Sequence, residues 1–338
     1  MSEKSTMSEI RFDDQVVIVT GAGGGLGRAY ALDIARRGGC VVVNDLGGTV
    51  EGHDASATNT SATPADAVVE EITAAGGRAV ANYDSVADAA GAENIVAAAL
   101  TAFGRVDALI NNAGNMRMAQ LEESEQKDFD ALLSVHLLGS YHMSKAVWPH
   151  MKQRGYGRIV FTASSAGLFG NPGQAFYGAA KAGVFGLMNT LSHEGLPHGI
   201  LCNVIMPNAF SRMTEKASEF TDPEALQRAS AILPLMQNSM QPEFNAGLAT
   251  YLASEKCSTT HGAYSACGGR IARVFVGVTE GWQGSREVPA SAEEIEQHFE
   301  RICDPQQGIH IPLSPSDEYR TVLSKSAPAC TGTGGGDK

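Results

Sequence analysis

The chain has 338 residues, of which 43% are hydrophobic and 18% are charged, a composition that supports a large globular core. Its formal net charge of −12 repels phosphate backbones and argues against binding to nucleic acids. No apolar run is long enough to span a bilayer, the polar N-terminus differs from a secretory signal, and the scattered cysteines form no metal-binding pattern. We therefore expect a cytoplasmic protein that binds no metal ion.

Short apolar runs alternate with helical segments along most of the chain. The predicted strands are residues 16–20, 40–45, 78–84, 106–111, 158–164 and 200–207. The predicted helices are residues 28–37, 65–75, 92–104, 125–154 and 175–195. Apolar strands that alternate with helices predict an α/β fold with a doubly wound parallel sheet of the Rossmann type.

Changes in composition predict the domain organisation. Residues 1–10 are expected to form an N-terminal tail, and residues 11–270 a dinucleotide-binding and catalytic domain with no internal linker. Residues 271–305 read as a C-terminal extension with a helix of its own. Residues 306–338 are expected to be a flexible tail, because the chain becomes polar and rich in Gly and Ser. Residues 46–64 are expected to form a long loop.

The segment TGAGGGLG follows the first predicted strand and leads into a helix. Glycines at such a place allow a sharp turn and bring backbone N–H groups close to a pyrophosphate. Leu26 stands where the third glycine of Gly-x-Gly-x-x-Gly would be. The spacing that fits is Gly21-x-x-x-Gly25-x-Gly27, which predicts a dinucleotide site contacted by Gly21, Gly25, Leu26 and Gly27.

Asp45 ends the second predicted strand. A carboxylate there can accept hydrogen bonds from the adenosine ribose hydroxyls, and it repels a 2′-phosphate. This favours NAD over NADP as the cofactor. The alternative is that Asp45 is only a turn residue.

Three further motifs follow in order: NNAG at residues 111–114, Ser164, and Tyr177-x-x-x-Lys181. With the glycine segment they resemble the short-chain dehydrogenase/reductase family across residues 11–270. The resemblance implies hydride transfer between an alcohol carbon and a nicotinamide. Tyr177 and Lys181 are four residues apart on a predicted helix, so they share one face.

The expected roles follow from acid–base chemistry. Tyr177 would act as the general base, because the ammonium of Lys181 and a positive nicotinamide ring both lower the pKa of a phenol. The resemblance also implies that Lys181 binds the nicotinamide ribose. The hydroxyl of Ser164, which fits the spacing better than Ser165, can bind the substrate oxygen. The alternative is a buried tyrosine, a surface lysine and a serine that merely ends a strand.

The family usually has an asparagine in the preceding helix, whose backbone carbonyl holds a water molecule on the lysine. This sequence has His136 there, in LLSVHLLGS. The backbone carbonyl survives the change, so His136 is a candidate fourth catalytic residue. Whether its imidazole moves protons or only packs stays open.

Further cofactor contacts are implied by the resemblance. They are expected beside the adenine, under the adenosine ribose and along the nicotinamide. In that order the residues are Asp84, Ser85 and Val86, then Asn112, Ala113 and Gly114, then Ala209 and Ser211. Asn208 replaces the glycine of the family's Pro-Gly pattern.

Finer motifs, among them NDLGG, GNPGQAFY and PNAFSRMT, are similar to one subgroup of the family. It comprises the (3R)-hydroxyacyl-CoA dehydrogenase region of peroxisomal multifunctional enzyme type 2 and bacterial relatives, some of them in steroid degradation. The similarity implies NAD-dependent oxidation of a fatty or steroid (3R)-hydroxyacyl-CoA by a homodimer or homotetramer. The alternative is a 17β-hydroxysteroid dehydrogenase or another dehydrogenase of free secondary alcohols.

Two observations bear on that substrate. Residues 206–240 are rich in methionine and suit either a flap over a bulky acyl group or a helix that packs on the core. Coenzyme A is polyanionic, so an acidic chain needs a local basic patch to bind it. The candidates are Arg117, Arg212, Lys216, Arg270 and Arg273.

Overall fold

The computed structural model of the chain describes residues 8–48, 63–209 and 236–324. The chain divides into two compact units, Met1–Arg273 and Val274–Lys338. Within the described residues no helix is both long enough and apolar enough to cross a membrane.

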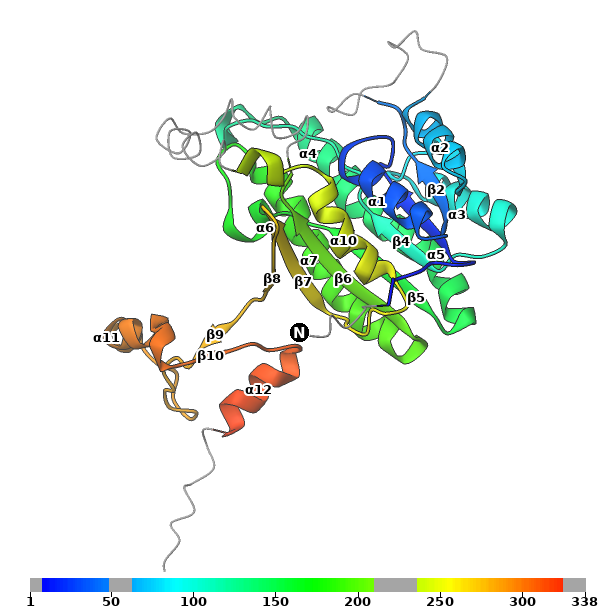
Figure 1. Ribbon diagram of the computed structural model, residues 1–338. Helices are drawn as coiled ribbons and strands as arrows, with labels where there is room; N and C mark the ends of the chain where they lie inside the picture. Colours follow the sequence, from blue (N-terminus) through cyan, green and yellow to red (C-terminus); the bar gives the residue numbers. More distant parts are fainter. Residues whose placement is uncertain (1–7, 49–62, 210–235, 325–338) are drawn as a thin grey trace, which may run out of the picture. The chain divides into compact units, whose positions relative to one another are not determined.

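An eight-stranded sheet forms the centre of the first unit (Figure 1). The strand order is β3-β2-β1-β4-β5-β6-β7-β8, and each neighbouring pair from β3 to β7 is parallel. The strands are β1 Val16–Thr20, β2 Cys40–Asn44, β3 Arg78–Asn82, β4 Ala108–Asn111, β5 Gly157–Thr162, β6 Ile200–Pro207, β7 Gly262–Cys267 and β8 Arg270–Val274. The doubly wound parallel sheet predicted from the sequence is confirmed.

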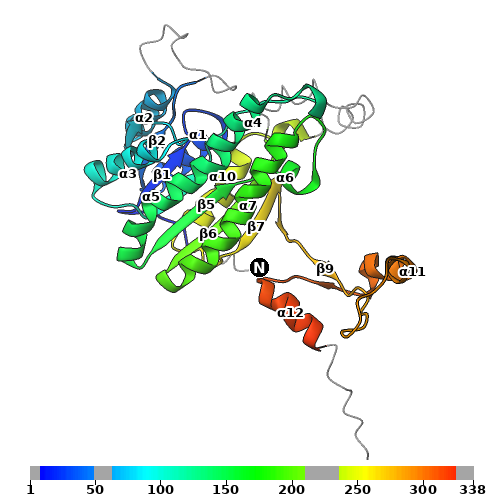
Figure 2. The same cartoon turned by 180° about the vertical axis from the view of Figure 1, so that it is seen from behind.

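Helices cover both faces of this sheet. The main ones are α1 Gly25–Arg36, α2 Pro64–Ala74, α3 Ala89–Phe103, α5 Gly139–Arg154, α7 Ala175–Gly195 and α10 Glu243–Ala253. Helices α1 and α10 lie over the face seen in Figure 1, and α5 and α7 lie over the opposite face, seen in Figure 2. Every residue of β1 and β2 is buried, as expected for strands between two helix layers.

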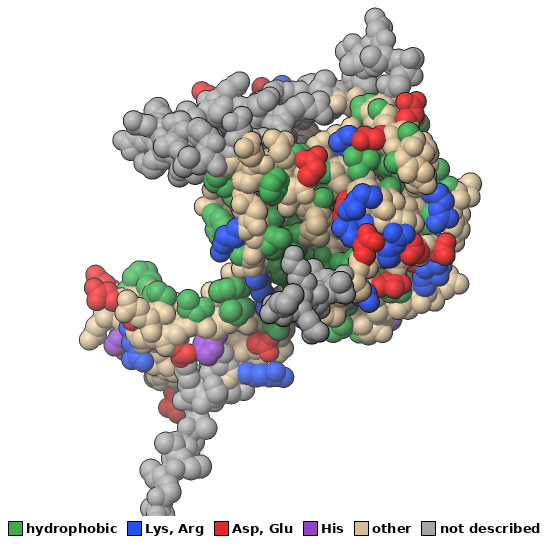
Figure 3. All heavy atoms as spheres, in the orientation of Figure 1, with side chains coloured by type: hydrophobic (Ala, Val, Ile, Leu, Met, Phe, Trp, Pro, Cys, Tyr) green, Lys and Arg blue, Asp and Glu red, His purple; other side chains and the backbone are tan. Residues whose placement is uncertain are grey.

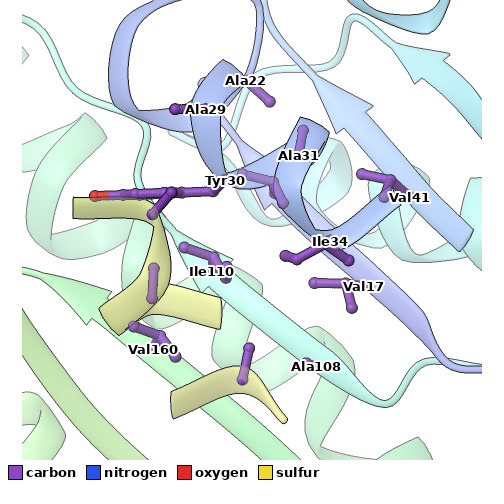
Figure 4. Packing of buried hydrophobic residues seen from close by; sticks show 14 of the residues in the cluster. Val17, Ala22, Ala29, Tyr30, Ala31, Ile34, Val41, Ala108, Ile110 and Val160 are labelled. Atoms are coloured by element: carbon purple, nitrogen blue, oxygen red, sulfur yellow. The ribbon is translucent and has the colours of Figure 1, made fainter. Parts of the chain in front are cut away.

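The core under α1 shows how the glycine segment is anchored. Tyr30 and Ile34 of α1 are fully buried against Val17 of β1 and its neighbours on adjacent strands (Figure 4). Burial of an isoleucine side chain stabilises a fold by about 1.5–3 kcal/mol. The helix that follows the glycines is therefore held firmly on the sheet.

The long helix predicted at residues 125–154 contains an irregularity. Helix α4, Gln126–Leu133, is followed by a π-helical segment, η3, Ser134–Leu138, and then by α5. A π turn holds one residue more than an α turn and is often found at functional sites. His136 lies on this segment.

The sequence did not predict β7, β8 or α10. The β7 segment, GAYSAC, is made mostly of small residues and lacks the β-branched run that marks the other strands. It nevertheless pairs with β6 along its length, from Asn203 opposite Gly262 to Pro207 opposite Ala266. The neighbouring strand, rather than local preference, decides its conformation.

The second unit has a different character. It contains the antiparallel pair β9 Val278–Thr279 and β10 Ile309–His310, and the helices α11 Ala292–Cys303 and α12 Pro315–Ser324. Helix α12 lies where a flexible tail was expected, and its first turn holds Asp317, whose carboxylate accepts the backbone N–H of Ser314. None of the described side chains of this unit is buried, and apolar side chains lie on its surface (Figure 3).

Candidate active site

The predicted site residues lie at one edge of the sheet. Parallel strands end together there, and a candidate follows the end of each: Gly21 after β1, Asp45 after β2, Asp84 after β3, Asn112 after β4, Ser164 after β5 and Asn208 after β6. Ligands of open α/β sheets bind outside this carboxyl edge. The fold thus brings residues distant in sequence to one location.

The glycine segment forms a tight turn with an open side. Gly21 and Gly25 have φ values of 62° and 51°, a region that favours glycine. A Cβ on Gly27 would lie 2.3 Å from the carbonyl oxygen of Gly21, whereas a Cβ on Gly24 would meet no atom within 4 Å. The packed side of the turn requires glycine, and the open side, at the N-terminus of α1, has room for a pyrophosphate.

Thr20 ties this turn to the NNAG motif. Its Oγ1 accepts the backbone N–H groups of Asn112 at 3.0 Å and Ala113 at 3.1 Å. The amide of Asn112 donates in turn to the carbonyl oxygens of Thr20 and Gly21, both at 3.0 Å. Sequence reasoning missed Thr20, although its position directly before the glycines was a usable signal.

Asp45 is bound to the same turn. Its Oδ2 accepts the N–H of Gly23 at 2.8 Å, and its Oδ1 accepts the N–H of Gly47 at 2.8 Å. The carboxylate is therefore held beside the glycines, where its remaining lone pairs can accept ribose hydroxyls and its charge opposes a 2′-phosphate.

The adenine side of the candidate site is hydrogen-bonded among its own residues. Asp84 accepts the side-chain amide of Asn82 at 2.7 Å and that of Asn94 at 3.0 Å. Ser85 accepts the N–H of Ala87 at 3.1 Å, and Val86 is buried. This segment is fixed by the protein itself.

Lys181 is a buried amine that donates to a backbone carbonyl. It is 4% exposed, and its Nζ donates to the carbonyl oxygen of Thr162 at 2.6 Å. Burial lowers its pKa to about 7. Thr162 Oγ1 is also buried and has no partner among the described residues. An ammonium has three donors, so this pocket fits further acceptors such as ribose hydroxyls.

Tyr177 lies beside this amine, and Ser164 is hydrogen-bonded to Tyr177. The Lys181 Nζ is 5.7 Å from the centroid of the Tyr177 ring. Ser164 caps α6, Ser165–Phe169, by accepting the N–H of Ala166 at 3.2 Å. Burial raises the pKa of Tyr177, and a hydrogen bond with Ser164 opposes that rise. The sequence predicted a lowered pKa, but burial of the phenol outweighs the neighbouring groups of the chain itself.

His136 also lies against Tyr177. The two rings meet edge to face, with centroids 5.3 Å apart. The His136 Nε2 lies 2.8 Å from the carbonyl oxygen of Asn115. Burial, followed by the charge of Lys181, lowers the pKa of His136 well below its ordinary value. Asn115 was missed by the sequence reasoning, which stopped at Gly114.

The remaining candidates make other contacts or lie outside the described residues. Ser211, Arg212 and Lys216 belong to the residues that the structure does not describe, as does most of the predicted flap. Arg117 pairs with Asp128 at 3.2 Å. Arg270 and Arg273 lie on β8. The backbone N–H of Asn208 donates to Ala266 at 2.8 Å, so Asn208 extends the pairing of β6 with β7.

Comparison with known proteins agrees with this geometry. Residues 15–224 match the family described as short chain dehydrogenase. The chain is 44% identical to mouse peroxisomal multifunctional enzyme type 2 over 88% of its own length, but spans only 38% of that enzyme. It is 43% identical to the short-chain type dehydrogenase/reductase Rv0148 of Mycobacterium tuberculosis, covering 86% of this chain and 94% of the relative.

A solved structure extends the likeness. A 7α-hydroxysteroid dehydrogenase complexed with NADH and 7-oxo glycochenodeoxycholic acid has a TM-score of 0.64 and 27% identity, covering 77% of this chain and 95% of that one. Family match, relatives and fold agree with the motifs at the carboxyl edge of the sheet. The chain belongs to the short-chain dehydrogenase/reductase family and is an oxidoreductase that acts on CH–OH groups.

Proposed function

We propose that the protein oxidises a (3R)-hydroxyacyl-CoA to the 3-ketoacyl-CoA with NAD⁺. One observation carries the chemistry: the buried amine of Lys181 lies beside Tyr177, which is hydrogen-bonded to Ser164, at the same sheet edge as the glycine turn. The subgroup motifs and the likeness to the mouse multifunctional enzyme support the acyl-CoA substrate.

NAD would lie along the carboxyl edge. The pyrophosphate would meet the open side of the turn at Gly24 and Gly25, and Asp45 would accept the adenosine ribose hydroxyls. The carboxylate of Asp45 favours NAD over NADP. The NADH in the related hydroxysteroid dehydrogenase structure is consistent with this choice.

The chain's own residues would handle the proton and the substrate oxygen. Bound NAD⁺ supplies an acceptor for the hydride that leaves the carbinol carbon. The Ser164 hydroxyl donates to the substrate oxygen and holds it near the Tyr177 phenol. Tyr177, as phenolate, takes the hydroxyl proton while the C–O bond becomes a carbonyl. Lys181 favours the phenolate through its charge whenever it is protonated.

A panel of substrates tests this function. Purified protein with NAD⁺ should reduce the nicotinamide when given (3R)-hydroxyacyl-CoA esters and should not do so with the (3S) esters or the free (3R)-hydroxy acids. NADP⁺ should support a much lower rate. Absence of turnover with every chain length and with steroid acyl-CoA esters would refute the proposal.

A second candidate is a dehydrogenase of free secondary alcohols, including 17β-hydroxysteroids. The likeness to a hydroxysteroid dehydrogenase favours it. The ratio of kcat/KM for a CoA ester to that for the matching free alcohol separates the two candidates. In either case we expect a homodimer or homotetramer in the cytoplasm, which light scattering and cell fractionation can check.

A further inference from the structure

A buried imidazole joins two parts of the candidate site. His136 is 2% exposed and lies on the π-helical segment η3. Its ring meets the ring of Tyr177 edge to face, with an interplanar angle of 89°. On the other side, Nε2 contacts Asn115, in the turn that follows β4. The same turn contains Asn112, Ala113 and Gly114, the residues expected under the adenosine ribose.

Two contacts with Asn115 bear on the tautomer. Nε2 lies 2.8 Å from the carbonyl oxygen of Asn115, and the backbone N–H of Asn115 is directed at Nε2 over the longer distance of 3.3 Å. If Nε2 carried no hydrogen, two lone pairs would face each other across the shorter contact. A hydrogen on Nε2 makes that contact a good hydrogen bond, so the Nε2–H form is favoured.

The rest of the ring fits a neutral state. Nδ1 is buried and has no hydrogen-bond partner among the described residues. Two titratable groups of α7 act on the ring: Tyr177 contacts it, and the charge of Lys181 lowers its pKa. Burial and the positive charge of Lys181 both disfavour a second proton on the ring.

Gly114 makes this placement sterically feasible. A Cβ on Gly114 would lie 2.5 Å from Cε1 of His136, closer than side chains approach one another. The imidazole therefore lies directly on the backbone of the turn. The His136 ring can occupy this position only because residue 114 has no side chain.

We propose that His136, as the neutral Nε2–H tautomer, is a positioning residue that fixes the Gly114–Asn115 turn relative to the ring of Tyr177. The inference rests on the proposed use of this turn for NAD and of Tyr177 as the base. His136 carries no proton during turnover in this arrangement. It acts by contacting the Gly114–Asn115 turn on one side and the phenol of Tyr177 on the other.

Two substitutions test which ring nitrogen of His136 is required. In His136→Gln the amide nitrogen can reach the place of Nε2 and donate to the Asn115 carbonyl. In His136→Asn the shorter amide ends near the place of Nδ1 and cannot. We expect Gln to keep the Kd for NAD⁺ within about threefold of wild type and Asn to raise it about tenfold, the effect of leaving a buried carbonyl unpaired.

The pH profile supplies a readout that distinguishes positioning from proton transfer. If His136 carries no proton, the limbs of the kcat/KM profile of His136→Gln coincide with those of wild type. The proposal would be overturned if the kcat/KM profile of His136→Gln lacked a limb that wild type shows. It would also be overturned if His136→Asn bound NAD⁺ more tightly than His136→Gln.

NMR spectroscopy tests the tautomer without any substrate. In ¹⁵N-histidine-labelled protein, the signal of His136 is identified by its absence from the spectrum of His136→Gln. This signal should show a protonated Nε2 and an unprotonated Nδ1 throughout the range from about pH 6 to about pH 9. A protonated Nδ1, or titration within that range, would contradict the inference. Because this result and the Kd for NAD⁺ need no acyl-CoA, they stand or fall separately from the substrate assay.

A double-mutant cycle tests the dependence on Gly114. Gly114→Ala should weaken NAD⁺ binding in wild type, because the new methyl group displaces the imidazole. The same substitution should cost less in a His136→Ala background, where that clash is gone. Equal losses in both backgrounds would show that the ring and the turn are independent.

Discussion

The two ends of the candidate site differ in how completely their polar groups are paired. At the glycine end, both oxygens of Asp45 accept backbone N–H groups, and Thr20 and Asn112 bind each other's segments. At the catalytic end, Thr162 Oγ1 and His136 Nδ1 are buried and have no partner within the described part of the chain.

This difference indicates which end of the site supports the fold and which end supports the reaction. Paired groups hold a turn in place before a ligand arrives, whereas buried groups without a partner reduce stability and suit a site that a ligand completes. Substitutions at the glycine end should therefore affect folding and cofactor affinity. Substitutions at the catalytic end should affect turnover, and at His136 cofactor affinity, while leaving the fold intact.

The largest effect is expected at Tyr177. Tyr177→Phe removes the group that accepts the proton and should lower kcat by about 10²–10⁴-fold, the usual contribution of a general base. The Kd for NAD⁺ and the thermal midpoint should stay close to wild type. Tyr141→Phe, at a 41% exposed position on α5, is the matched control and should leave kcat unchanged. Retained turnover in Tyr177→Phe would remove Tyr177 from the mechanism.

Asp45 should decide between the two nicotinamide cofactors. Asp45→Asn keeps the size of the side chain but removes its charge, so NAD⁺ affinity should fall by about 1.5–3 kcal/mol while NADP⁺ affinity rises. Fluorescence titration with both cofactors measures the ratio of the two Kd values. An unchanged ratio would show that other residues select the cofactor.

The packing of the glycine turn predicts a contrast between two similar substitutions. Gly27→Ala places a methyl group 2.3 Å from the Gly21 oxygen and should destabilise the protein by about 1–3 kcal/mol. Gly24→Ala, with an extended φ of −168° and no atom within 4 Å, should leave the unfolding free energy of the cofactor-free protein unchanged. Equal effects in urea unfolding would mean that the turn adapts.

The smallest effect concerns stability and pH at Lys181. Its pKa is about 7 when folded, against an ordinary value of 10.5, so between these values the unfolded chain binds a proton that the folded chain does not. Stability should therefore rise with pH across that window, and below about pH 7 the residue is fully destabilising.

Lys181→Met should remove this rise and increase the thermal midpoint most at low pH, by about 2–4 °C for each kcal/mol recovered. The exposed Lys152 provides the control, since Lys152→Met should keep the slope of wild type. A Lys181→Met variant with the wild-type slope would show that this amine is solvated.

Much of the site could be predicted because it depends on strand ends. The motifs other than Tyr177-x-x-x-Lys181 follow apolar segments, and such segments form parallel strands with a common carboxyl edge, so order in the sequence translates into proximity. The neighbours that complete the site could not be predicted. Thr162 and Asn115 contribute backbone carbonyl oxygens, which every residue type carries, so their roles depend on the fold alone.

The pKa of Tyr177 shows a second limit. Its sequence neighbours suggest a lowered pKa, but how deeply a side chain is buried depends on packing between distant segments. The strand β7 shows a third limit, because its small residues become a strand through pairing with β6.

The π-helical segment Ser134–Leu138 has a consequence for how this chain can change in length. Each residue of a helix turns the chain by about 100° around the helix axis. Deleting one residue of the π-helical segment would therefore restore regular α-helical spacing but rotate α4 around its axis. The imidazole of His136 would then lose its contact with the phenol of Tyr177, although the sequence would still contain every residue of the site. Residue count within this helix is therefore as constrained as residue identity, and length variation is better tolerated in surface loops.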